Sequence, residues 1–328
     1  MNILVTGGAG YIASFMSKRL LDDGYTVTIA DSLERGFEKA IDKRAVFKKG
    51  NLTDEQFLTE LFSSTNFDAI IHFAAYISMG ESMQNPYIYF ANNTNMALKL
   101  LEAAREHNVK KFIFSSTAGV YGNPVKVPIS EDHSKNPENP YGESKLMVES
   151  LLKWYQRIHG MNYAVLRYFN ACGASLDGTL GENHEPETHI IPNAIKAVLY
   201  KKPFTLFGND YKTPDGTCVR DYIHVLDLVE AHVLALKKLQ NEQGGFTYNV
   251  GTGKGFSNKE VLDMVKKISG EDLHVEIAQR RPGDAEILVA DVTKINTELN
   301  FVPKYSDLET IVKTAWEWHK KNFKPSAS

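Results

Sequence analysis

The sequence predicts an α/β protein in which helices cover both faces of a parallel β-sheet. In the first half of the 328-residue chain, short apolar runs alternate with helix-compatible segments. These runs are almost continuously apolar, which is typical of parallel strands that are buried on both faces. A glycine-rich turn also joins the first apolar run to the first helical segment. Together the two observations predict a doubly wound (Rossmann) sheet.

The expected elements follow one another in a regular order. Four apolar runs are interpreted as strands: 2–6, 25–30, 68–73 and 111–115. Three segments are interpreted as helices: 11–23, 92–107 and 140–159. The last of these has a clear start, because Asn139 can cap it and Pro140 suits the first helical position.

The second half of the chain has a different pattern. Polar stretches rich in Gly and Pro, at 177–187 and 208–216, interrupt shorter elements, as is typical of loops around a binding site. We therefore expect a doubly wound sheet domain over 1–170 and a smaller mixed α/β lobe, mainly for binding a ligand, over 171–328. The chain is expected to return to the first domain around 215–250.

Composition excludes several classes of function. Hydrophobic residues make up 43% and charged residues 23% of the chain, which is ordinary for a soluble protein. The formal net charge is -3 without a long basic run, so neither nucleic acid nor a membrane surface is expected as a partner. No apolar stretch reaches the roughly 20 residues that span a bilayer. The first residues resemble a strand rather than an export signal, and two cysteines, Cys172 and Cys218, favour a cytoplasmic location.

The glycine-rich turn predicts a dinucleotide site. Gly7, Gly10 and Ala13 have G-x-x-G-x-x-A spacing, and glycine there lets the backbone approach a pyrophosphate at a helix N-terminus. Glycine turns are common, but Asp31 ends the next strand about 20 residues on, where a carboxylate can bind the adenosine ribose. Its charge would repel a 2′-phosphate, so we expect NAD rather than NADP, although Arg35 is nearby.

Two further strand ends suit the same cofactor. Asn51 and Leu52 follow a strand-like segment and could contact the adenine, and 73–75 ends another strand with small residues. On spacing alone, either set would suit packing in the core equally well.

A tyrosine and a lysine predict alcohol oxidation. Tyr141 and Lys145 are four residues apart, so they share one face of the expected helix. A free tyrosine has a pKa of about 10 and is a poor base at neutral pH, but an ammonium and an oxidised nicotinamide both favour the phenolate. Such pairs occur by chance on surface helices. Here Ser115, Ser116 and Thr117 end a strand, where hydroxyls face the ligand crevice of a doubly wound sheet.

The glycine motif, the hydroxyl-bearing strand end and Tyr-x-x-x-Lys together resemble the extended short-chain dehydrogenase/reductase family. Within it, the sequence is similar almost end to end to the UDP-glucose 4-epimerases. The segments that carry this similarity are 73–84, 112–122, 139–149, 166–173, 206–227, 248–253 and 280–284.

The resemblance implies an isomerase that keeps NAD bound and interconverts UDP-galactose and UDP-glucose through a transient 4-keto sugar. It implies that Tyr141 takes the proton from the 4-hydroxyl, that Lys145 lowers the pKa of Tyr141 and holds the nicotinamide ribose, and that Thr117 assists. The implied cofactor contacts are Gly7, Gly10, Tyr11, Ile12, Asp31, Ser32, Asn51, Leu52, Phe73, Ala74, Ala75, Asn92, Ser115, Tyr141, Lys145 and Tyr168.

The resemblance also implies substrate contacts and an assembly. Arg220 and Arg281 match diphosphate-binding arginines, whose planar guanidinium donates hydrogen bonds in pairs. The other implied contacts are Thr117, Asn170, His189, Ile190, Phe207 and Asp284. A homodimer is implied in which 92–107 and 140–159 pair across a two-fold axis, although those apolar stripes could equally pack on the sheet.

Some positions differ from the commonest pattern of the family. Ala13 replaces a glycine, and Asn51 replaces an aspartate, so its adenine hydrogen bond must differ. Ile77 replaces a frequent lysine, which removes a charged cofactor contact. Leu288 falls where the pocket varies in size, and a tyrosine there is associated with excluding N-acetylated sugars. Because leucine is intermediate, UDP-GlcNAc and UDP-GalNAc stay open as substrates.

Four other functions compete with this interpretation: a nucleotide-sugar dehydratase, decarboxylase or uronate epimerase, and a non-catalytic NAD-binding sensor. A 4,6-dehydratase needs an acid–base pair, usually Asp-Glu, where Thr117 and Ala118 stand. A uronate epimerase needs an extra basic or polar group for the sugar carboxylate, which the sequence neither locates nor excludes. A non-catalytic NAD-binding sensor tends to lose the tyrosine or the lysine, and both are present here.

The segment from His184 to His189 resembles a zinc motif, but its spacing differs. It reads His-Glu-Pro-Glu-Thr-His, with three residues between the first Glu and the second His instead of two. Pro186 also breaks the helix on which such ligands stand. We therefore expect no metal.

Overall fold

The computed structural model describes residues 1–281 and 284–322. Its main sheet has seven parallel strands in the order β10-β6-β5-β4-β1-β2-β3. This confirms the predicted fold class. The strands are β1 (Asn2–Thr6), β2 (Thr26–Asp31), β3 (Val46–Lys49), β4 (Ala69–His72), β5 (Lys111–Thr117), β6 (Asn162–Tyr168) and β10 (Gly245–Val250).

The chain reverses its direction of travel across this sheet between β1 and β4. From β1 it moves through β2 to β3, and it then returns to β4 on the other side of β1. Ligands of doubly wound sheets bind outside the carboxyl ends of the strands at such a reversal. Thr6 and His72, whose side chains lie 2.7 Å apart (Oγ1 to Nδ1), mark that point at the ends of β1 and β4.

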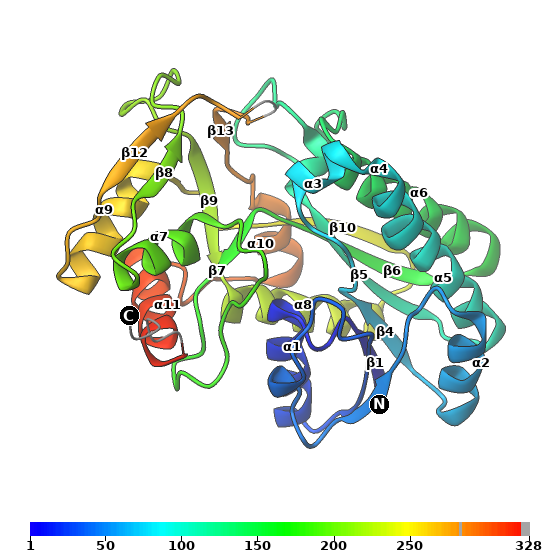
Figure 1. The fold of residues 1–328 in the computed structure, drawn as a ribbon. Coiled ribbons are helices and arrows are strands. Elements are labelled where there is room, and N and C mark those ends of the chain that lie inside the picture. The colour runs from blue at the N-terminus through cyan, green and yellow to red at the C-terminus, as the bar shows by residue number, and fades with distance from the viewer. Residues whose placement is uncertain (282–283, 323–328) are drawn as a thin grey trace.

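Helices pack on both faces of the main sheet, as the apolar strands require (Figure 1). One face carries α1 (Tyr11–Asp22) and α8 (Val225–Asn241), which pack on residues such as Val5 and Ile29. The opposite face carries α2 (Glu55–Ser64), α5 (Met96–Glu106) and α6 (Pro140–His159), which pack on residues such as Leu4 and Phe112. Short elements connect these: η1 (Glu38–Ala40), α3 (Met79–Gln84), α4 (Pro86–Tyr89), η2 (Phe90–Asn95) and η3 (Ala118–Tyr121).

The helix expected over 92–107 begins later than predicted. Residues 90–95 form the π-helical segment η2, and the α-helix starts at Met96. Asn93 lies in this segment, where its Oδ1 accepts a hydrogen bond from Tyr76 N (2.8 Å) and its Nδ2 donates to Ser144 Oγ (3.0 Å). The segment therefore joins the loop after β4 to the first turns of α6.

The second lobe, at the left of Figure 1, has its own small sheets. It also has an apolar core of its own. Strand β9 (Val219–His224) pairs with β7 (Asn170–Cys172), β11 (Gly255–Ser257) and β13 (Ile287–Leu288), and β8 (Phe204–Phe207) pairs with β12 (Val275–Ala278). The helices here are α7 (Ile190–Leu199), α9 (Asn258–Ser269) and α11 (Leu308–Asn322), while α10 (Thr293–Leu299) contacts β10. Although α8 and β10 come late in the sequence, they belong to the main sheet and its covering layer.

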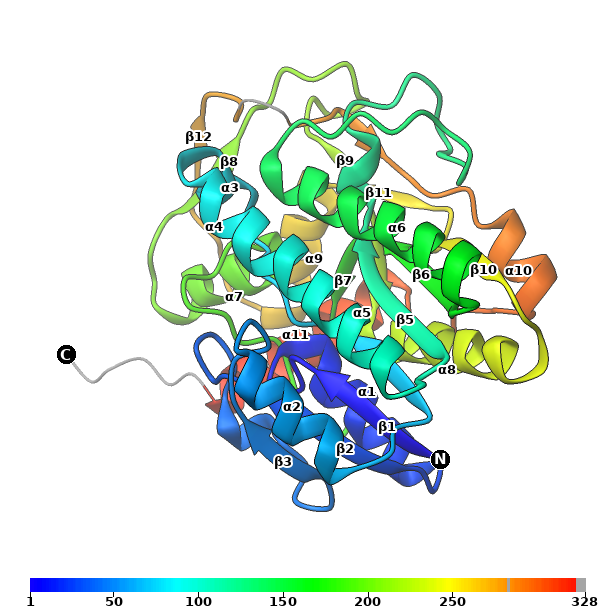
Figure 2. The ribbon, with the colours of Figure 1, turned by 90° about the vertical axis from the view of Figure 1, so that its right-hand side faces the viewer.

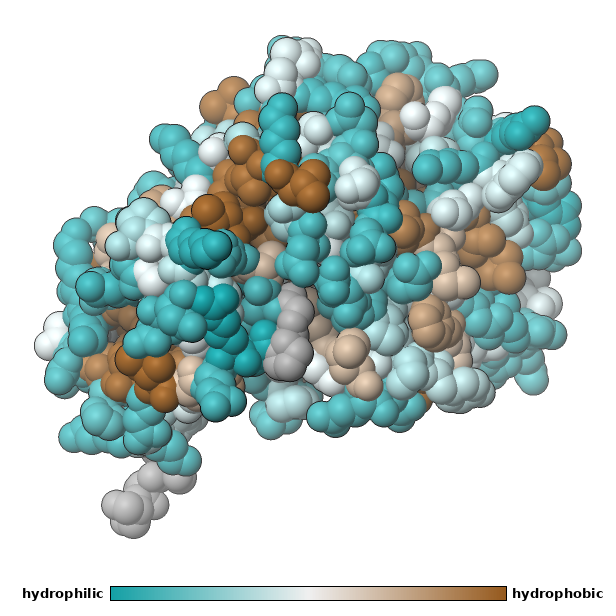
Figure 3. Space-filling model, turned by 90° about the horizontal axis from the view of Figure 1, so that it is seen from above, coloured by the Kyte–Doolittle hydropathy of each residue, from teal (hydrophilic) through white to brown (hydrophobic). Residues whose placement is uncertain are grey.

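One face of the molecular surface can be followed in Figure 3. The face in Figure 3 is mainly hydrophilic, with separate apolar patches among the polar side chains. Among the described helices, none combines the length and the apolar character that crossing a membrane requires. Cys172 and Cys218 lie beneath this surface as buried free thiols.

Candidate active site

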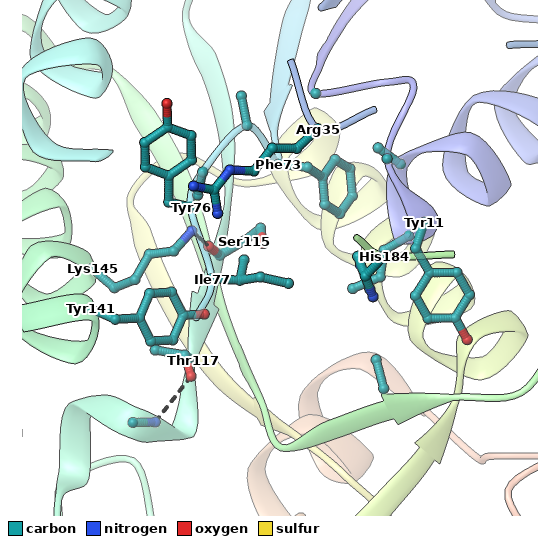
Figure 4. Close-up of a pocket in the computed structure, with 18 of the residues that line it drawn as sticks. Tyr11, Arg35, Phe73, Tyr76, Ile77, Ser115, Thr117, Tyr141, Lys145 and His184 are labelled. Carbon is teal, nitrogen blue, oxygen red and sulfur yellow. Dashed lines mark hydrogen bonds between the residues drawn. The ribbon is translucent and has the colours of Figure 1, made fainter. Parts of the chain in front are cut away.

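A cavity lies at the carboxyl ends of the main-sheet strands, between the two lobes (Figure 4). Every residue predicted to contact NAD lines it. On the glycine-turn side these are Gly7, Gly10, Tyr11, Ile12, Asp31, Ser32, Asn51, Leu52, Phe73, Ala74 and Ala75. On the other side they are Asn92, Ser115, Tyr141, Lys145 and Tyr168.

The glycine turn leaves the N-terminus of α1 open to an anion. Gly7 has a φ of +71°, and a Cβ there would lie 2.7 Å from Ala74 N, so the two turns approach closely only because Gly7 is glycine. Gly10 is the N-cap of α1 and provides no capping side chain, and the first turn contains no acidic residue. The free N–H groups and the helix dipole therefore suit a pyrophosphate.

Asp31 is held in the cavity wall by two backbone N–H groups. Its Oδ2 accepts a hydrogen bond from Ala9 N (3.0 Å), and its Oδ1 accepts one from Leu33 N (2.8 Å). Arg35 is not an open cation beside it, because its guanidinium donates to both oxygens of Glu81 (3.0 and 2.9 Å) and stacks 3.9 Å from the Tyr76 ring centroid. With Arg35 paired in this way, the carboxylate dominates and favours NAD over NADP.

The amide oxygen of Asn51 is already occupied within the protein, and its contact with the adenine stays a prediction. Its Oδ1 accepts hydrogen bonds from Thr53 N (2.9 Å) and Thr53 Oγ1 (2.8 Å), which use both lone pairs of that oxygen. Only the amide NH2 of Asn51 is left to contact a ligand in the cavity.

Tyr141 and Lys145 enter the cavity from the first turns of α6. Asn139 caps this helix, since its Oδ1 accepts a hydrogen bond from Gly142 N (2.9 Å). The helix approaches η3 closely, because a Cβ on Gly142 would lie 2.6 Å from Gly119 O. The Tyr141 hydroxyl consequently points toward Thr117 at the end of β5, as Figure 4 shows.

The electrostatics of the pair differ from the expectation. Burial raises the pKa of Tyr141 to about 12, with the Thr117 hydroxyl acting in the opposite direction. Burial also lowers the pKa of Lys145 to about 7, and its Nζ donates to Ser115 O at 2.9 Å. We expected Lys145 to make Tyr141 more acidic, but desolvation dominates both groups. The protein groups alone therefore leave Tyr141 a protonated phenol at neutral pH.

A buried charge network fixes α6 against the sheet, and sequence reasoning missed it. Arg167 on β6 and Glu149 on α6 form an ion pair with 2.6 Å between NH2 and Oε2, and both side chains are at most 2% exposed. Ser116 Oγ donates to Glu149 Oε1 (2.7 Å), and Arg167 also donates to Tyr121 OH (2.8 Å). The neighbouring Ser115 and Thr117 are thereby held in register with the helix that carries Tyr141.

The predicted substrate contacts divide into two groups. Thr117, Asn170, His189 and Arg220 line the cavity. The other four, Ile190, Phe207, Arg281 and Asp284, do not appear in its wall. Three of these contact one another: Arg281 Nε donates to Asp284 Oδ2 (3.0 Å), and its guanidinium lies 4.9 Å from the Phe207 ring centroid. Their substrate role stays a prediction, and residues 282–283 of the same segment lie outside the described residues.

The cavity wall also contains residues that the sequence did not single out as contacts. Ala118 and Phe169 follow strand ends, so the rule that found Thr117 and Tyr168 would have found them. Two others, Met79 and Met96, begin the helices α3 and α5. Several more come from loops, whose paths have no such rule, among them Glu34, Tyr76, Glu138, Asn139, Glu182, His184 and Ala285. Leu288, at which the predicted pocket varies in size, also lines the cavity.

Comparison with known proteins agrees with this geometry. Residues 3–251 match the model of the NAD dependent epimerase/dehydratase family. The chain is 45% identical over 323 residues to the UDP-glucose 4-epimerase of Lactobacillus helveticus, covering 98% of each chain. It resembles the crystal structure of UDP-glucose 4-epimerase from Bifidobacterium longum in complex with NAD+ and UDP, with a TM-score of 0.94, 37% identity and coverage of 98% of this chain and 99% of that one. The Brucella ovis enzyme in complex with NAD gives a TM-score of 0.93 at 42% identity, over 96% and 97% of the two chains. The chain therefore belongs to the NAD dependent epimerase/dehydratase family, and within it to the UDP-glucose 4-epimerases, which confirms the family resemblance of the sequence.

Proposed function

We propose that this protein interconverts UDP-galactose and UDP-glucose by epimerising the sugar at its 4-carbon, with NAD kept bound between turnovers. The observation that carries the proposal is the placement of Tyr141, Thr117 and Lys145 in the same cavity as the glycine turn and Asp31. A uronate epimerase and a non-catalytic sensor are not favoured, because the relatives are UDP-glucose 4-epimerases and the Tyr-Lys pair is present.

The residues present fit NAD. The uncapped N-terminus of α1 suits its pyrophosphate, Asp31 suits a ribose, and Lys145 is positioned to contact the second ribose. When bound, NAD supplies the acceptor that oxidises the sugar alcohol and the donor that reduces the ketone again.

Tyr141 is the proposed carrier of the proton of the sugar 4-hydroxyl. Tyr141 takes the proton from the sugar 4-hydroxyl as that carbon is oxidised, and it returns the proton after the 4-keto sugar has presented its other face. Thr117 donates a hydrogen bond to the same sugar oxygen. Because burial raises the pKa of Tyr141 to about 12, the phenolate requires positive charge in the cavity, which the ammonium form of Lys145 and an oxidised nicotinamide provide.

The second lobe is proposed to hold the nucleotide. Arg220 lines the cavity from β9, where its NH1 donates to Val219 O (3.0 Å) and Glu286 O (3.4 Å). Its NH2 lies 4.0 Å from Asp284 Oδ1, an ion pair too long for a hydrogen bond, so NH2 and Nε can still donate to a diphosphate. Asn170, at the start of β7, faces the same space and offers amide groups to the sugar.

Incubation of the purified protein with UDP-galactose, without added cofactor, tests the proposal. We expect UDP-glucose to accumulate, and Tyr141→Phe to lower turnover by roughly 10²–10⁴ while NAD content is unchanged. Tyr155→Phe is the matched control, since Tyr155 lies on the same helix with its hydroxyl bound to Glu102. Near-normal epimerisation by Tyr141→Phe would contradict the proposed role of this residue.

We also propose a homodimer that pairs α5 and α6, which lie side by side in Figure 2. Their outward face exposes Leu98, Met147, Trp154 and Ile158, with 39% to 65% of each residue accessible. Trp154→Glu is expected to shift the sedimenting species toward the monomer. Val302→Glu, also at an exposed apolar residue but between α10 and α11, should leave it unchanged. Equal effects of the two variants would argue against this interface.

A cytoplasmic location is likewise proposed from the use of cysteine. Both thiols are free and buried, which is compatible with a reducing compartment.

A further inference from the structure

Four metal-ligating side chains converge in the loop between β7 and α7. Glu182, His184, Glu187 and His189 each present one ligand atom, and these atoms lie within 4.8 Å of one another. The sequence argued against a metal because Pro186 prevents a helix. A helix is not needed, because the loop folds back on itself and brings all four side chains together without helical spacing.

The distances match those between the ligands of one small cation. His184 Nδ1 lies 3.3 Å from Glu182 Oε1 and 3.7 Å from Glu187 Oε1, and His189 Nδ1 lies 2.6 and 3.5 Å from the same two oxygens. Tetrahedral Zn²⁺ with bonds of about 2.0 Å holds its ligand atoms about 3.3 Å apart. Three of the four distances are close to this value. The fourth, at 2.6 Å, is a hydrogen bond between His189 Nδ1 and Glu182 Oε1, which a cation bound by both atoms would replace.

The cluster also contains buried polar atoms that no protein group satisfies. His184 Nδ1 is buried 3.3 Å from Glu182 Oε1 and 3.7 Å from Glu187 Oε1, yet it has no hydrogen bond of suitable geometry to either oxygen. Glu187 Oε2 is likewise buried without a hydrogen-bond partner, and the nearest cation in an ion pair with it is Lys196 Nζ, at 3.8 Å. Buried polar atoms normally have partners, so an orphaned imidazole nitrogen here points to a ligand.

The charge of the cluster agrees with a dication. The side chains of Glu182 and Glu187 are both only 4% exposed, and two carboxylates so buried repel each other unless positive charge lies between them. A divalent cation between two neutral imidazoles and two carboxylates would balance that charge. Two protonated imidazoles would also balance it: burial lowers the pKa of His184, but the two carboxylates raise it to about 9. His184 Nδ1 nevertheless has no hydrogen bond of suitable geometry to either carboxylate, so a cation satisfies this nitrogen better than a proton does.

We propose that Glu182, His184, Glu187 and His189 bind one Zn²⁺-type cation as a closed structural site. Two imidazoles with two carboxylates suit Zn²⁺ rather than Mg²⁺ or Ca²⁺, which prefer sites made of oxygen alone. Four protein ligands leave no open position, so the cation has no part in the chemistry. Its role is to fasten the loop to the N-terminus of α7, where His189 is the N-cap residue.

The position of the site explains why such a fastening matters. Glu182, His184 and His189 line the cavity, and the ring of His184 meets that of Tyr11 edge to face, with centroids 6.2 Å apart. Tyr11 OH in turn donates to Gly173 O at 2.6 Å, so the loop closes against the first turn of α1. His189 would then serve the wall of the cavity rather than the sugar. This role of the cation does not depend on the proposed reaction.

Metal analysis of the full protein tests the proposal. We expect about one zinc per chain in protein purified without chelator and without a histidine tag. His184→Ala should lose it, whereas Glu185→Gln should keep it, since Glu185 is an exposed carboxylate of the same loop outside the cluster. Replacement by Co²⁺ should give the visible absorption of a tetrahedral site in the wild type and in Glu185→Gln only.

Thermal unfolding gives a second readout that does not depend on any variant folding. Chelator should lower the Tm of the wild type, and added Zn²⁺ should restore it. Zinc-treated, desalted wild-type protein with no bound metal and an unchanged Tm would overturn the proposal. So would the same zinc stoichiometry in His184→Ala as in the wild type, because the ion would then lie elsewhere.

Discussion

Replacing Lys145 by Met should make the protein more stable and far less active at the same time. The Lys145 residue is 2% exposed, and burial lowers its pKa from 10.5 to about 7. The folded state therefore binds its proton more weakly than the unfolded state does. The buried ammonium consequently costs stability at any pH below about 7, and this cost fades as the pH rises from about 7 toward 10.5, where both states become neutral.

The size of the effect follows from that pKa. A fall from 10.5 to about 7 corresponds to a destabilisation of at most about 5 kcal/mol below neutral pH. Methionine keeps most of the apolar stem but loses the 2.9 Å hydrogen bond to Ser115 O, which is worth about 1 kcal/mol. We expect Lys145→Met to be more stable by about 3 kcal/mol at about pH 6, with the gain shrinking at about pH 9.

Urea unfolding of nucleotide-free protein measures the stability, since a ligand that binds only the folded state would add its own contribution. Turnover of UDP-galactose, measured over the same range of pH, should fall at least about a hundredfold at neutral pH. A structural lysine would show both quantities falling together. A Lys145→Met protein that is less stable than the wild type at about pH 6 would refute the burial argument, and one that keeps its turnover would refute the catalytic one.

Three further predictions concern other parts of the site. Glu149→Gln leaves the guanidinium of Arg167 buried without a counter-charge, so it should lower the free energy of unfolding in urea by about 3–5 kcal/mol. Glu242→Gln is the control, since the side chain of Glu242 is 53% exposed in its ion pair, and it should lower that free energy by under about 1 kcal/mol. Similar losses in the two variants would contradict the role of burial. Asp31→Asn removes the charge that opposes a 2′-phosphate, so calorimetry should show the affinity for NADP rising at least about tenfold relative to that for NAD. An unchanged ratio of the two affinities would contradict the role of Asp31 in selecting NAD. Leu288→Tyr narrows the cavity and should lower kcat/KM for N-acetylated UDP-sugars at least about tenfold more than for UDP-galactose; a uniform decline would show that this position does not select the sugar.

The sequence predicted the parts of the site that follow from one rule of the fold. Strands of a parallel sheet end at the same edge, so the order of strands along the chain was enough to place Thr117 and Asp31 in one crevice. The glycine turn is local and equally readable. The contacts that join these segments are not local. For example, Asn93 accepts a hydrogen bond from the backbone N–H of Tyr76, 17 positions earlier, and this contact holds Tyr76 in the wall of the cavity.

Charge was the property most often misread from the sequence. Arg167 interrupts an otherwise apolar strand, and nothing in its spacing shows that Glu149, on a helix, lies opposite it in the core. The segment from His184 to His189 was tested only against helical metal motifs, because spacing describes regular elements and not loops that fold back. Arg35 left the choice between NAD and NADP open in the sequence. In the structure its charge is paired with that of Glu81, which is 46 positions away in the chain.

One physical cause shifts the pKa values of both Tyr141 and Lys145: a cavity from which water is excluded disfavours a single charge. Burial raises the pKa of Tyr141 to about 12 and lowers that of Lys145 to about 7, so at neutral pH the isolated phenol stays protonated while the lysine is only partly charged. Deprotonating Tyr141 at pH 7 would cost about 7 kcal/mol by itself. A phenolate and an ammonium in the same low-dielectric space stabilise each other, so the two charges form more easily together than either does alone. A positively charged cofactor in that space would favour the phenolate in the same way, and burial strengthens that attraction as well. The burial that keeps Tyr141 protonated in isolation therefore ties its activation to the oxidised cofactor, so that the phenolate becomes populated when an acceptor for the sugar's electrons is present.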